Sequence, residues 1–312
     1  SSDLHVIRKI SPAGVVTTLA GLGGTAAYLD GVGTAARFYN PTGVAVDGAG
    51  TVYVADQANH VIRKITPNGV VSTLAGLGGT TGSTDATGSS ARFCNPTGIA
   101  VDASGTVYVA DLSNHAIRKI TPAGSVSTLA GLSGNAGGVD GQGTTARFYN
   151  PYGIAVDFAG NIYVGDSSYH LIRKITPGGY VTTIGGTLNA AGSTDGLGAV
   201  ARFYNPSGIA VDSVGNLYLA DRSNHIIRKG LPYAGVANLA ASALGAPTDF
   251  ASATIDLGAL DAPVTLLITG TAQTTARALN LAGTTGTVTL DQSATGPVVF
   301  AGSFMVSGAR SE

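Results

Sequence analysis

A stretch of 55 residues recurs along most of this chain with no insertion between the copies. Histidine stands at positions 5, 60, 115, 170 and 225, and an Asn-Pro pair begins at positions 40, 95, 150 and 205. Such regular spacing means that one supersecondary unit is repeated and stacked side by side. Because a single unit has too small a core of its own, neighbouring units must bury each other's faces.

Each repeat contains four short runs with the composition of β-strands. In one copy they cover residues 98–102, 107–110, 116–120 and 126–129, and Asp102 and Gly105 mark the tight turn between the first two. No window has apolar residues at helical spacing. Four antiparallel strands in a period somewhat above the roughly 40–45 residues of a WD blade predict an all-β protein, a β-propeller.

The core of the repeat resembles the NHL repeat. The fifth copy, residues 206–229, reads PSGIAVDSVGNLYLADRSNHIIRK, and earlier copies continue with TPxGxVxTLAG and a later ARF. The resemblance is to the long bacterial form of the repeat and covers residues 1–241. It implies a propeller of four-stranded blades, a fold that hosts binding modules and enzymes alike.

Counting strands exposes an incomplete blade. With the strands labelled a to d outward from the central channel, strands a and b occur four times and strand c five times. Strand d occurs four times clearly, and a weaker fifth copy is expected at residues 236–239. We therefore predict about five four-stranded blades, the first reduced to a c–d hairpin. The predicted domains are a propeller at 1–241 and a β-rich C-terminal segment at 242–312.

An open ring exposes strand edges that invite pairing with other chains. The N-terminal hairpin, the C-terminal segment or another subunit would each be able to complete the ring, and the sequence leaves these three alternatives open. Strand addition from a second subunit would give a head-to-tail homo-oligomer or filament. The candidate strand-exchange residues are those of the first strand c: His5, Val6, Ile7, Arg8, Lys9 and Ile10.

The C-terminal segment lacks the repeat but keeps a β pattern. Apolar runs stand at residues 264–269, 278–281, 288–290 and 298–300, and they are separated by Gly and Pro. The segment resembles the start of the Ig-like modules that often follow bacterial surface propellers. It is shorter than the roughly 100 residues of such a domain. A partial sandwich and an exchanged set of strands are therefore equal alternatives.

Composition narrows the choice of partners. The net charge is −1 and charged residues make up 11% of the chain, which argues against nucleic acid or an acidic membrane surface as a partner. No membrane span or signal peptide is visible. Low charge, a single Cys and abundant Thr, Ser, Ala and Gly suit an exported bacterial protein that is extracellular or at the cell surface.

The five histidines suggest a metal site, but the fold argues against one. They are expected in the loops between strands b and c, about 10 Å outside strand a, so equivalent atoms in neighbouring blades lie too far apart for one metal. Zinc ligands must lie within about 2.0–2.3 Å of the ion. We predict instead that each histidine forms a hydrogen bond that fixes its loop, and we expect no cofactor and no metal.

Recurring charged residues also have structural interpretations. The Asp at 56, 111, 166 and 221 is expected to cap the following loop as an Asx turn, and the Asp at 47, 102, 157 and 212 to open a D-x-x-G turn. A cation held by the second set is the alternative. Arg37, Arg92, Arg147 and Arg202 each follow an Asp by seven residues, which predicts an ion pair that pins the long loop.

The leading functional hypothesis is a non-enzymatic binding or structural module, adhesin-like, with a protein or glycan ligand. Antiparallel order places the long loops and the b–c loops on one face, where a ligand is expected. The candidate ligand face comprises Asn59, His60, Asn114, His115, His170, Asn224 and His225. The alternative is a metal-dependent lyase or hydrolase with a site in the channel. Some NHL propellers are such lyases, but strand a supplies no histidine here.

Overall fold

The computed structural model describes residues 4–230 continuously, and beyond residue 230 it describes six strands between residues 255 and 300. The chain divides into two compact units, residues 1–230 and 231–312. Each is described by itself. The predicted boundary at 241 lies outside the described residues, as does the predicted strand at 236–239.

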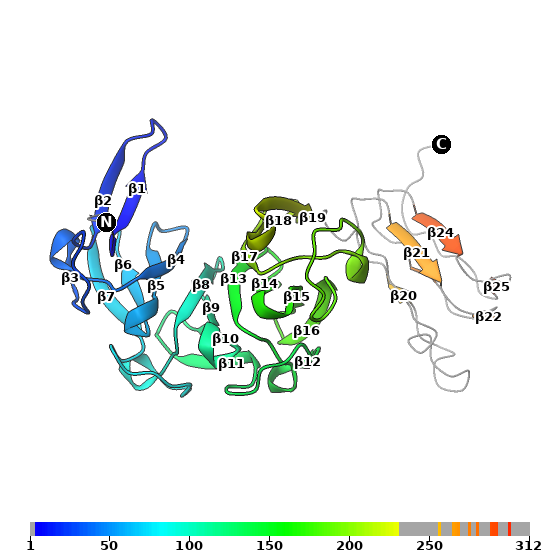
Figure 1. Ribbon diagram of the computed structural model, residues 1–312, viewed down its shortest axis with the longest axis horizontal. Coiled ribbons are helices and arrows are strands. Elements are labelled where there is room, and N and C mark those ends of the chain that lie inside the picture. The colour runs from blue at the N-terminus through cyan, green and yellow to red at the C-terminus, as the bar shows by residue number, and fades with distance from the viewer. Residues whose placement is uncertain are drawn as a thin grey trace. The chain divides into compact units, whose positions relative to one another are not determined.

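The first unit is a series of antiparallel sheets, one for each repeat (Figure 1). Blade 1 is the hairpin of β1 (Ile7–Ile10) and β2 (Val16–Ala20). Blade 2 contains β4 (Pro41–Val46), β5 (Val52–Asp56), β6 (Val61–Ile65) and β7 (Val70–Ala75), with the short β3 (Gly31–Val32) outside β7.

Blade 3 contains β8 (Pro96–Val101), β9 (Val107–Asp111), β10 (Ala116–Ile120) and β11 (Val126–Gly131). Blade 4 contains β13 (Pro151–Val156), β14 (Ile162–Asp166), β15 (Leu171–Ile175) and β16 (Tyr180–Gly185), with β12 (Gly141–Gln142) outside β16. Blade 5 has three described strands, β17 (Pro206–Val211), β18 (Leu217–Asp221) and β19 (Ile226–Gly230). The predicted strand order within the repeat is thus confirmed.

Short 3₁₀ turns of three residues are the helical elements of this unit. Four precede an inner strand: η1 (Gly33–Ala35), η3 (Gly88–Ser90), η5 (Gly143–Thr145) and η7 (Gly198–Val200). Four join strands b and c: η2 (Gln57–Asn59), η4 (Leu112–Asn114), η6 (Ser167–Tyr169) and η8 (Arg222–Asn224). Each of the second group ends at a histidine with positive φ, between 55° and 61°.

The inner strands β4, β8, β13 and β17 are successive neighbours along an open arc (Figure 1). A glycine in each of β4, β8 and β13 makes the close approach of the next strand feasible. A Cβ atom on Gly98 would lie 2.3 Å from the Tyr152 carbonyl oxygen, and one on Gly153 would lie 1.9 Å from the Ser207 carbonyl oxygen. The P-x-G motif therefore reflects the contact between blades.

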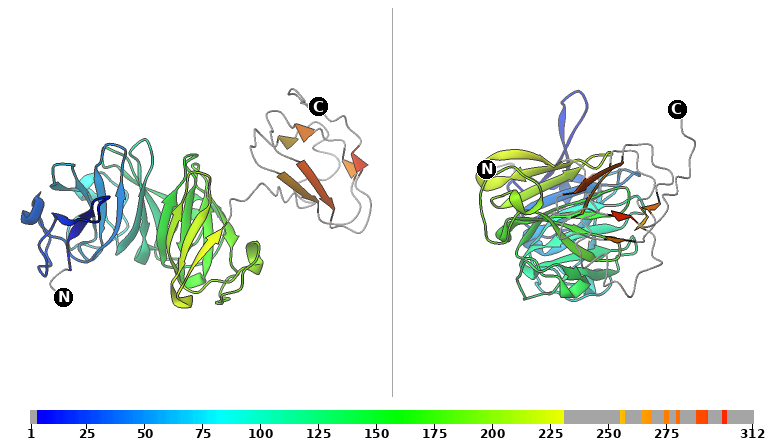
Figure 2. Two further views of the ribbon diagram at one scale, coloured as in Figure 1. Left: turned by 90° about the horizontal axis from the view of Figure 1, so that it is seen from above. Right: turned by 90° about the vertical axis from the view of Figure 1, so that its right-hand side faces the viewer.

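The core lies between blades, whose sheets stand face to face in the left view of Figure 2. We call the face of a blade that packs on the next blade its trailing face, and the opposite face its leading face. Between blades 3 and 4, Tyr108 and Ile117 of the trailing face join Phe148, Ile154 and Ile175 of the leading face in one buried cluster. Each repeat thus contributes half of two interfaces.

The second unit has six described strands in three parallel pairs: β20 (Ile255–Asp256) with β23 (Leu279–Asn280), β21 (Val264–Ile268) with β24 (Val288–Gln292), and β22 (Thr274–Thr275) with β25 (Val299–Phe300). Strands overlap all four apolar runs predicted from the sequence. The chain is all-β in both units, as predicted.

Candidate functional site

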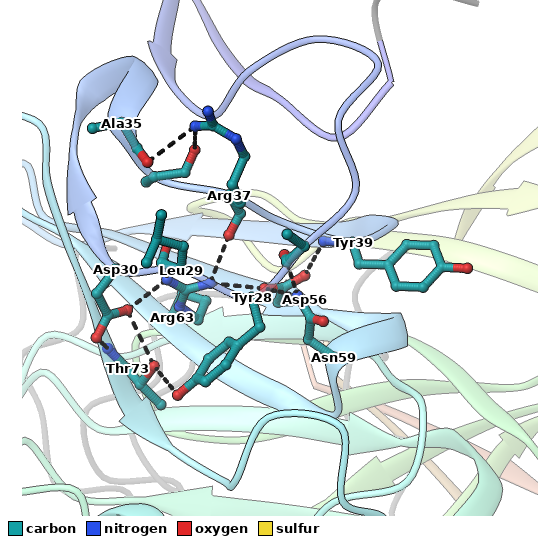
Figure 3. Close-up of polar contacts among 12 residues, drawn as sticks. Tyr28, Leu29, Asp30, Ala35, Arg37, Tyr39, Asp56, Asn59, Arg63 and Thr73 are labelled. Atoms are coloured by element: carbon teal, nitrogen blue, oxygen red, sulfur yellow. Dashed lines mark hydrogen bonds and ion pairs between the residues drawn. The ribbon is translucent and has the colours of Figure 1, made fainter.

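One polar network recurs in each of blades 2 to 5 and holds the long loop before that blade. Figure 3 shows the copy in blade 2. In blade 2, the buried Asp56 accepts hydrogen bonds from the Tyr39 N–H at 2.7 Å, from the Asn59 side-chain amide at 2.9 Å and from the Arg63 guanidinium at 2.9 Å. Arg63 also donates to the carbonyl oxygens of Leu29 and Arg37. The buried carboxylate of Asp56 is thereby paired with the buried guanidinium of Arg63.

The network includes an aromatic contact and a second carboxylate. The Arg63 guanidinium lies 5.1 Å from the ring centroids of Phe38 and Tyr28, at cation–π distance. Its other terminal nitrogen donates to Asp30, which also accepts hydrogen bonds from the backbone N–H and hydroxyl of Thr73. Asp30 therefore links the long loop to β7.

Two predictions about these charges are wrong. Asp56 does not cap its own loop, because the described 3₁₀ turn makes no side-chain cap bond to it. Its carboxylate reaches instead to a loop 17 residues earlier and to the next strand. Nor does Arg37 pair with Asp30: Arg37 donates to the carbonyl oxygens of Thr34, Ala35 and Ala36, and Arg63 takes the carboxylate.

Burial raises the pKa of the paired acids in blades 3 and 4. Desolvation raises the pKa of Asp111 to about 6, against the opposing effect of Arg118 and of the hydrogen bonds from Asn114 and Cys94. Desolvation raises the pKa of Asp166 further, to about 7, again against Arg173. Asp166 has no asparagine partner of this kind, because Tyr169 stands where Asn114 stands in blade 3. The missing hydrogen bond is consistent with the higher value.

The histidines form hydrogen bonds between blades. His60 Nδ1 accepts the backbone N–H of Asn95 at 3.2 Å, and the same bond joins His5 to Asn40, His115 to Asn150 and His170 to Asn205. The predicted loop-fixing role is thus confirmed for these four histidines, and the partner lies in the next repeat. Desolvation lowers the pKa of His60 and His115, which favours the neutral ring, and a neutral ring nitrogen can accept a hydrogen bond.

The structure separates the members of the candidate ligand face. Asn59 and Asn114 are buried, and each donates from its amide to the acid of its own blade and to a carbonyl oxygen of the long loop. Asn224 makes the same two bonds in blade 5. The histidines are at least partly accessible, and His225 is exposed. A ligand on this face would meet imidazole edges and loop side chains before these amides.

Tyrosines follow the histidines along this face, a feature that the sequence reasoning missed. Tyr149 and Tyr204 are half-exposed, and each packs edge-on against the histidine of the preceding blade, with centroid distances of 5.4 and 5.3 Å. Tyr169 lies 5.2 Å from Tyr149. Tyr39, Tyr149 and Tyr204 recur at the repeat's spacing, and that recurrence was the available signal.

The second set of acids caps turns, as predicted. Asp102 accepts the N–H groups of Ser104 and Thr106 and the hydroxyl of Tyr108. Burial alone would raise the pKa of Asp102, but these hydrogen bonds outweigh it and lower the pKa. Desolvation and the adjacent carboxylate raise the pKa of Tyr108 to about 12. In the described part of the chain, no three His, Cys, Asp or Glu side chains gather as metal ligands would.

The strand-exchange residues form an ordered hairpin. His5 binds Asn40, Ile7 is buried beside Phe38, and residues Ile7 to Ile10 pair with β2. The opposite edge of β1 pairs with no other strand among those described. None of the helices in the described residues is long and apolar enough to span a membrane.

The comparisons with known proteins agree with this architecture. A family model described as the NHL repeat matches residues 38–65, 93–120 and 203–229. The chain is 30% identical over 242 residues to "Protein SUPPRESSOR OF QUENCHING 1, chloroplastic" of Arabidopsis thaliana, covering 73% of this chain and 23% of that protein. It is 28% identical over 262 residues to "NHL repeat-containing protein 2" of Bos taurus, covering 73% and 36%. It therefore spans well under half of these relatives.

Two solved structures from Bacteroides thetaiotaomicron share the fold. A protein described as of unknown function matches with a TM-score of 0.55 and 25% identity, over 70% of this chain and 50% of the other. An auxiliary nutrient binding protein matches with a TM-score of 0.56 and 21% identity, over 73% and 53%. The likeness to the second shows the fold alone.

Proposed function

This chain is an NHL-repeat β-propeller protein, and from that premise we propose that it is a non-enzymatic binding module whose ligand face carries the d–a and b–c loops. The observation that carries the proposal is the departure from repeat symmetry at Tyr169. Blades 2, 3 and 5 have an asparagine there, turned into the blade. Blade 4 has a tyrosine that joins Tyr149 and His115 in one aromatic cluster.

This cluster has the composition of a recognition surface. Tyrosine offers a flat apolar ring with few rotatable bonds, together with a hydroxyl that forms hydrogen bonds. Nearby, the Asn150 side chain donates to the Ser168 hydroxyl at 2.9 Å, so polar groups border the rings. A glycan, with apolar C–H faces and hydroxyl rims, matches that arrangement, and a protein loop is the alternative ligand.

Export to a bacterial surface, where the module would act as an adhesin-like protein, is part of the same proposal. A solved structure with the same fold is that of an auxiliary nutrient binding protein from Bacteroides thetaiotaomicron. The weakly charged composition of this chain is in keeping with that setting. We expect neither nucleic acid nor a bound metal to take part.

The test is a glycan array probed with three proteins. Wild type is expected to bind a subset of glycans, and Tyr149→Ser combined with Tyr169→Ser is expected to lose that binding. Phe158→Ser is the matched control, since Phe158 is 90% exposed but lies in the turn between β13 and β14, at the other face. Equal binding by all three proteins would contradict the ligand face. Stoichiometric metal in the purified protein would favour the lyase or hydrolase alternative.

A structural role by strand addition is the second part of the proposal. The observation that favours it is the free edge of β1, whose backbone groups have no strand partner among those described. An exposed strand edge of this kind invites pairing with another strand. The C-terminal segment 242–312, of the same chain or of a neighbour, is the proposed donor.

Truncation after Ala241 tests this second part. Loss of folding would favour pairing within the chain, whereas loss of assembly with the fold retained would favour exchange between chains. An unchanged, stable, monomeric propeller would contradict strand addition from this segment.

A further inference from the structure

The trailing face of blade 5 is exposed in the described part of the chain, although the same face is buried in blades 2, 3 and 4. Ile227 is 74% exposed, whereas its equivalent Ile117 in blade 3 is 0% exposed. Tyr218 is exposed as well, while Tyr108 is buried. The difference is not one of sequence, because both blades have Tyr and Ile at these positions. It arises because no described blade follows blade 5.

The leading face of blade 1 is bare in the complementary way. Ile10 is 68% exposed, whereas its equivalent Ile120 is 0% exposed. Val16 is exposed too, and its equivalent Val126 is buried. These two side chains belong to the hairpin, so they lie on the outer half of the blade, where strands c and d pack on the preceding repeat.

The buried interface between blades 2 and 3 shows what these faces fit. There Ile62 of the trailing face shares one core cluster with Ile120 and Val126 of the leading face. Ile227 stands three repeats after Ile62, and Ile10 and Val16 stand two repeats before Ile120 and Val126. The two ends of the arc therefore carry the two halves of an interface that this chain already forms within itself.

We propose that the trailing face of blade 5 binds the leading face of blade 1 in a second copy of this chain. The partner is identified by the repeat itself, because the docking residues on both sides have buried equivalents in the described interfaces. Contact through side-chain faces is distinct from strand addition, which uses the backbone edge of β1. The inference extends the structural part of the proposed function and is independent of the ligand face.

Such an interface is heterologous, since two different patches meet. Head-to-tail contacts of this kind close into a ring when the rotation allows it and otherwise continue as a filament. Burial of large apolar side chains that are exposed in the single copy supplies the driving force. A ring leaves neither face exposed, and a filament leaves one exposed face at each of its two ends.

The experiment measures the mass of the full chain by sedimentation velocity over a range of concentrations. Wild type is expected to show a weight-average mass that rises at least about two-fold with concentration. Ile227→Glu and Ile10→Glu are each expected to remain monomeric, because a carboxylate enters the interface. Phe158→Glu is the control for adding a charge at an exposed apolar site, and it is expected to assemble like wild type.

Mixing the two interface variants gives the sharpest outcome. Ile227→Glu keeps an intact blade 1 and Ile10→Glu keeps an intact blade 5, so an equimolar mixture is expected to form a 1:1 dimer and nothing larger. That dimer would also show that both variants are folded. Wild type that stays monomeric, or assembly that survives Ile227→Glu, would overturn the proposal. Glycan binding by monomeric Ile227→Glu separates this result from the fate of the ligand face.

Discussion

The interior blades and the two ends of the arc share one sequence pattern but differ in burial. Ile117 of blade 3 lies inside a cluster that extends into blade 4, whereas Ile227 of blade 5 lies at the surface. Repeat proteins are stabilised by each repeat's own folding and by contacts with its nearest neighbours. Equivalent positions such as Ile117 and Ile227 have the same side chain but different neighbours. Comparing them therefore separates the contribution of the neighbouring repeat from that of the repeat itself.

The polar network behaves differently from the apolar faces. Arg228 at the end of the arc keeps all four bonds that Arg118 makes in the interior: to Asp221, to Asp195 and to the carbonyl oxygens of Arg202 and Thr194. The network is therefore contained within one repeat and its preceding loop. Each repeat therefore supplies all the bonds that its arginine makes to the long loop, whereas its two apolar faces are buried only by neighbouring repeats.

The largest expected effect concerns that network. Arg118→Gln removes the partner of Asp111 and is expected to destabilise the protein by about 3–5 kcal/mol, because a buried charge is left unpaired. Arg228→Gln is expected to cost about 2 kcal/mol or more, since Asp221 is also buried. Urea unfolding followed by circular dichroism measures both. A negligible loss for Arg228→Gln would show that the network does depend on a following blade.

Truncation of an apolar side chain should give a larger difference in stability between an interior blade and blade 5. Ile117→Ala is expected to cost about 2–5 kcal/mol, because it leaves a cavity between two blades. Ile227→Ala is expected to change stability by less than about 0.5 kcal/mol, as for an ordinary surface site. The measurement is made on dilute, monomeric protein. Similar losses for both variants would mean that blade 5 is covered in solution.

The sequence predicted the strands and turns because their signals are local. The run at 107–110 and the D-x-x-G turn at Asp102 depend on residues a few positions apart, and both were observed. The pairing of charges was harder. In a strict repeat every Asp and every Arg recurs together, so periodicity does not show which pair is in contact. Asp30 was therefore assigned to Arg37, seven residues away, rather than to Arg63.

The role of each site residue also depended on neighbours that the pattern does not display. A histidine that fixes a loop was predicted, but its partner is a backbone N–H 35 residues later, in another blade. The half-exposed tyrosines of the ligand face escaped notice because tyrosine in a β repeat usually indicates a core position. Only the packing of blade on blade shows which of them, such as Tyr149, lie at the rim.

The inner-strand glycines give a smaller but cleaner comparison. Gly98→Ala is expected to cost about 1–3 kcal/mol, because the new Cβ would lie 2.3 Å from the Tyr152 carbonyl oxygen and the strands must separate. Gly208→Ala is expected to be neutral, since its Cβ would meet only the Ala220 Cβ, at 3.5 Å. Thermal unfolding of the two variants compares them. Equal destabilisation would indicate a neighbouring strand beside β17.

The smallest expected effect depends on pH. His115→Phe keeps the ring against Tyr149 but removes the nitrogen that accepts the Asn150 N–H, and it is expected to cost about 1 kcal/mol at pH 7.5. Because desolvation lowers the pKa of His115, the folded state holds the neutral ring. The stability that the ring contributes is thus present above the unfolded pKa of about 6.5 and is lost as the pH falls below it.

The difference between wild type and His115→Phe should therefore shrink as the pH is lowered from 7.5 to 5. Asp111 titrates in the same range in the opposite sense, but both proteins contain it, so its contribution cancels in the difference. His225→Phe is the matched control at the end of the arc. The described residues show no Asn N–H donating to His225. This variant is therefore expected to have the same stability as wild type at both pH values. A pH-independent loss for His115→Phe would mean that the ring stabilises the interface by packing rather than by accepting a hydrogen bond.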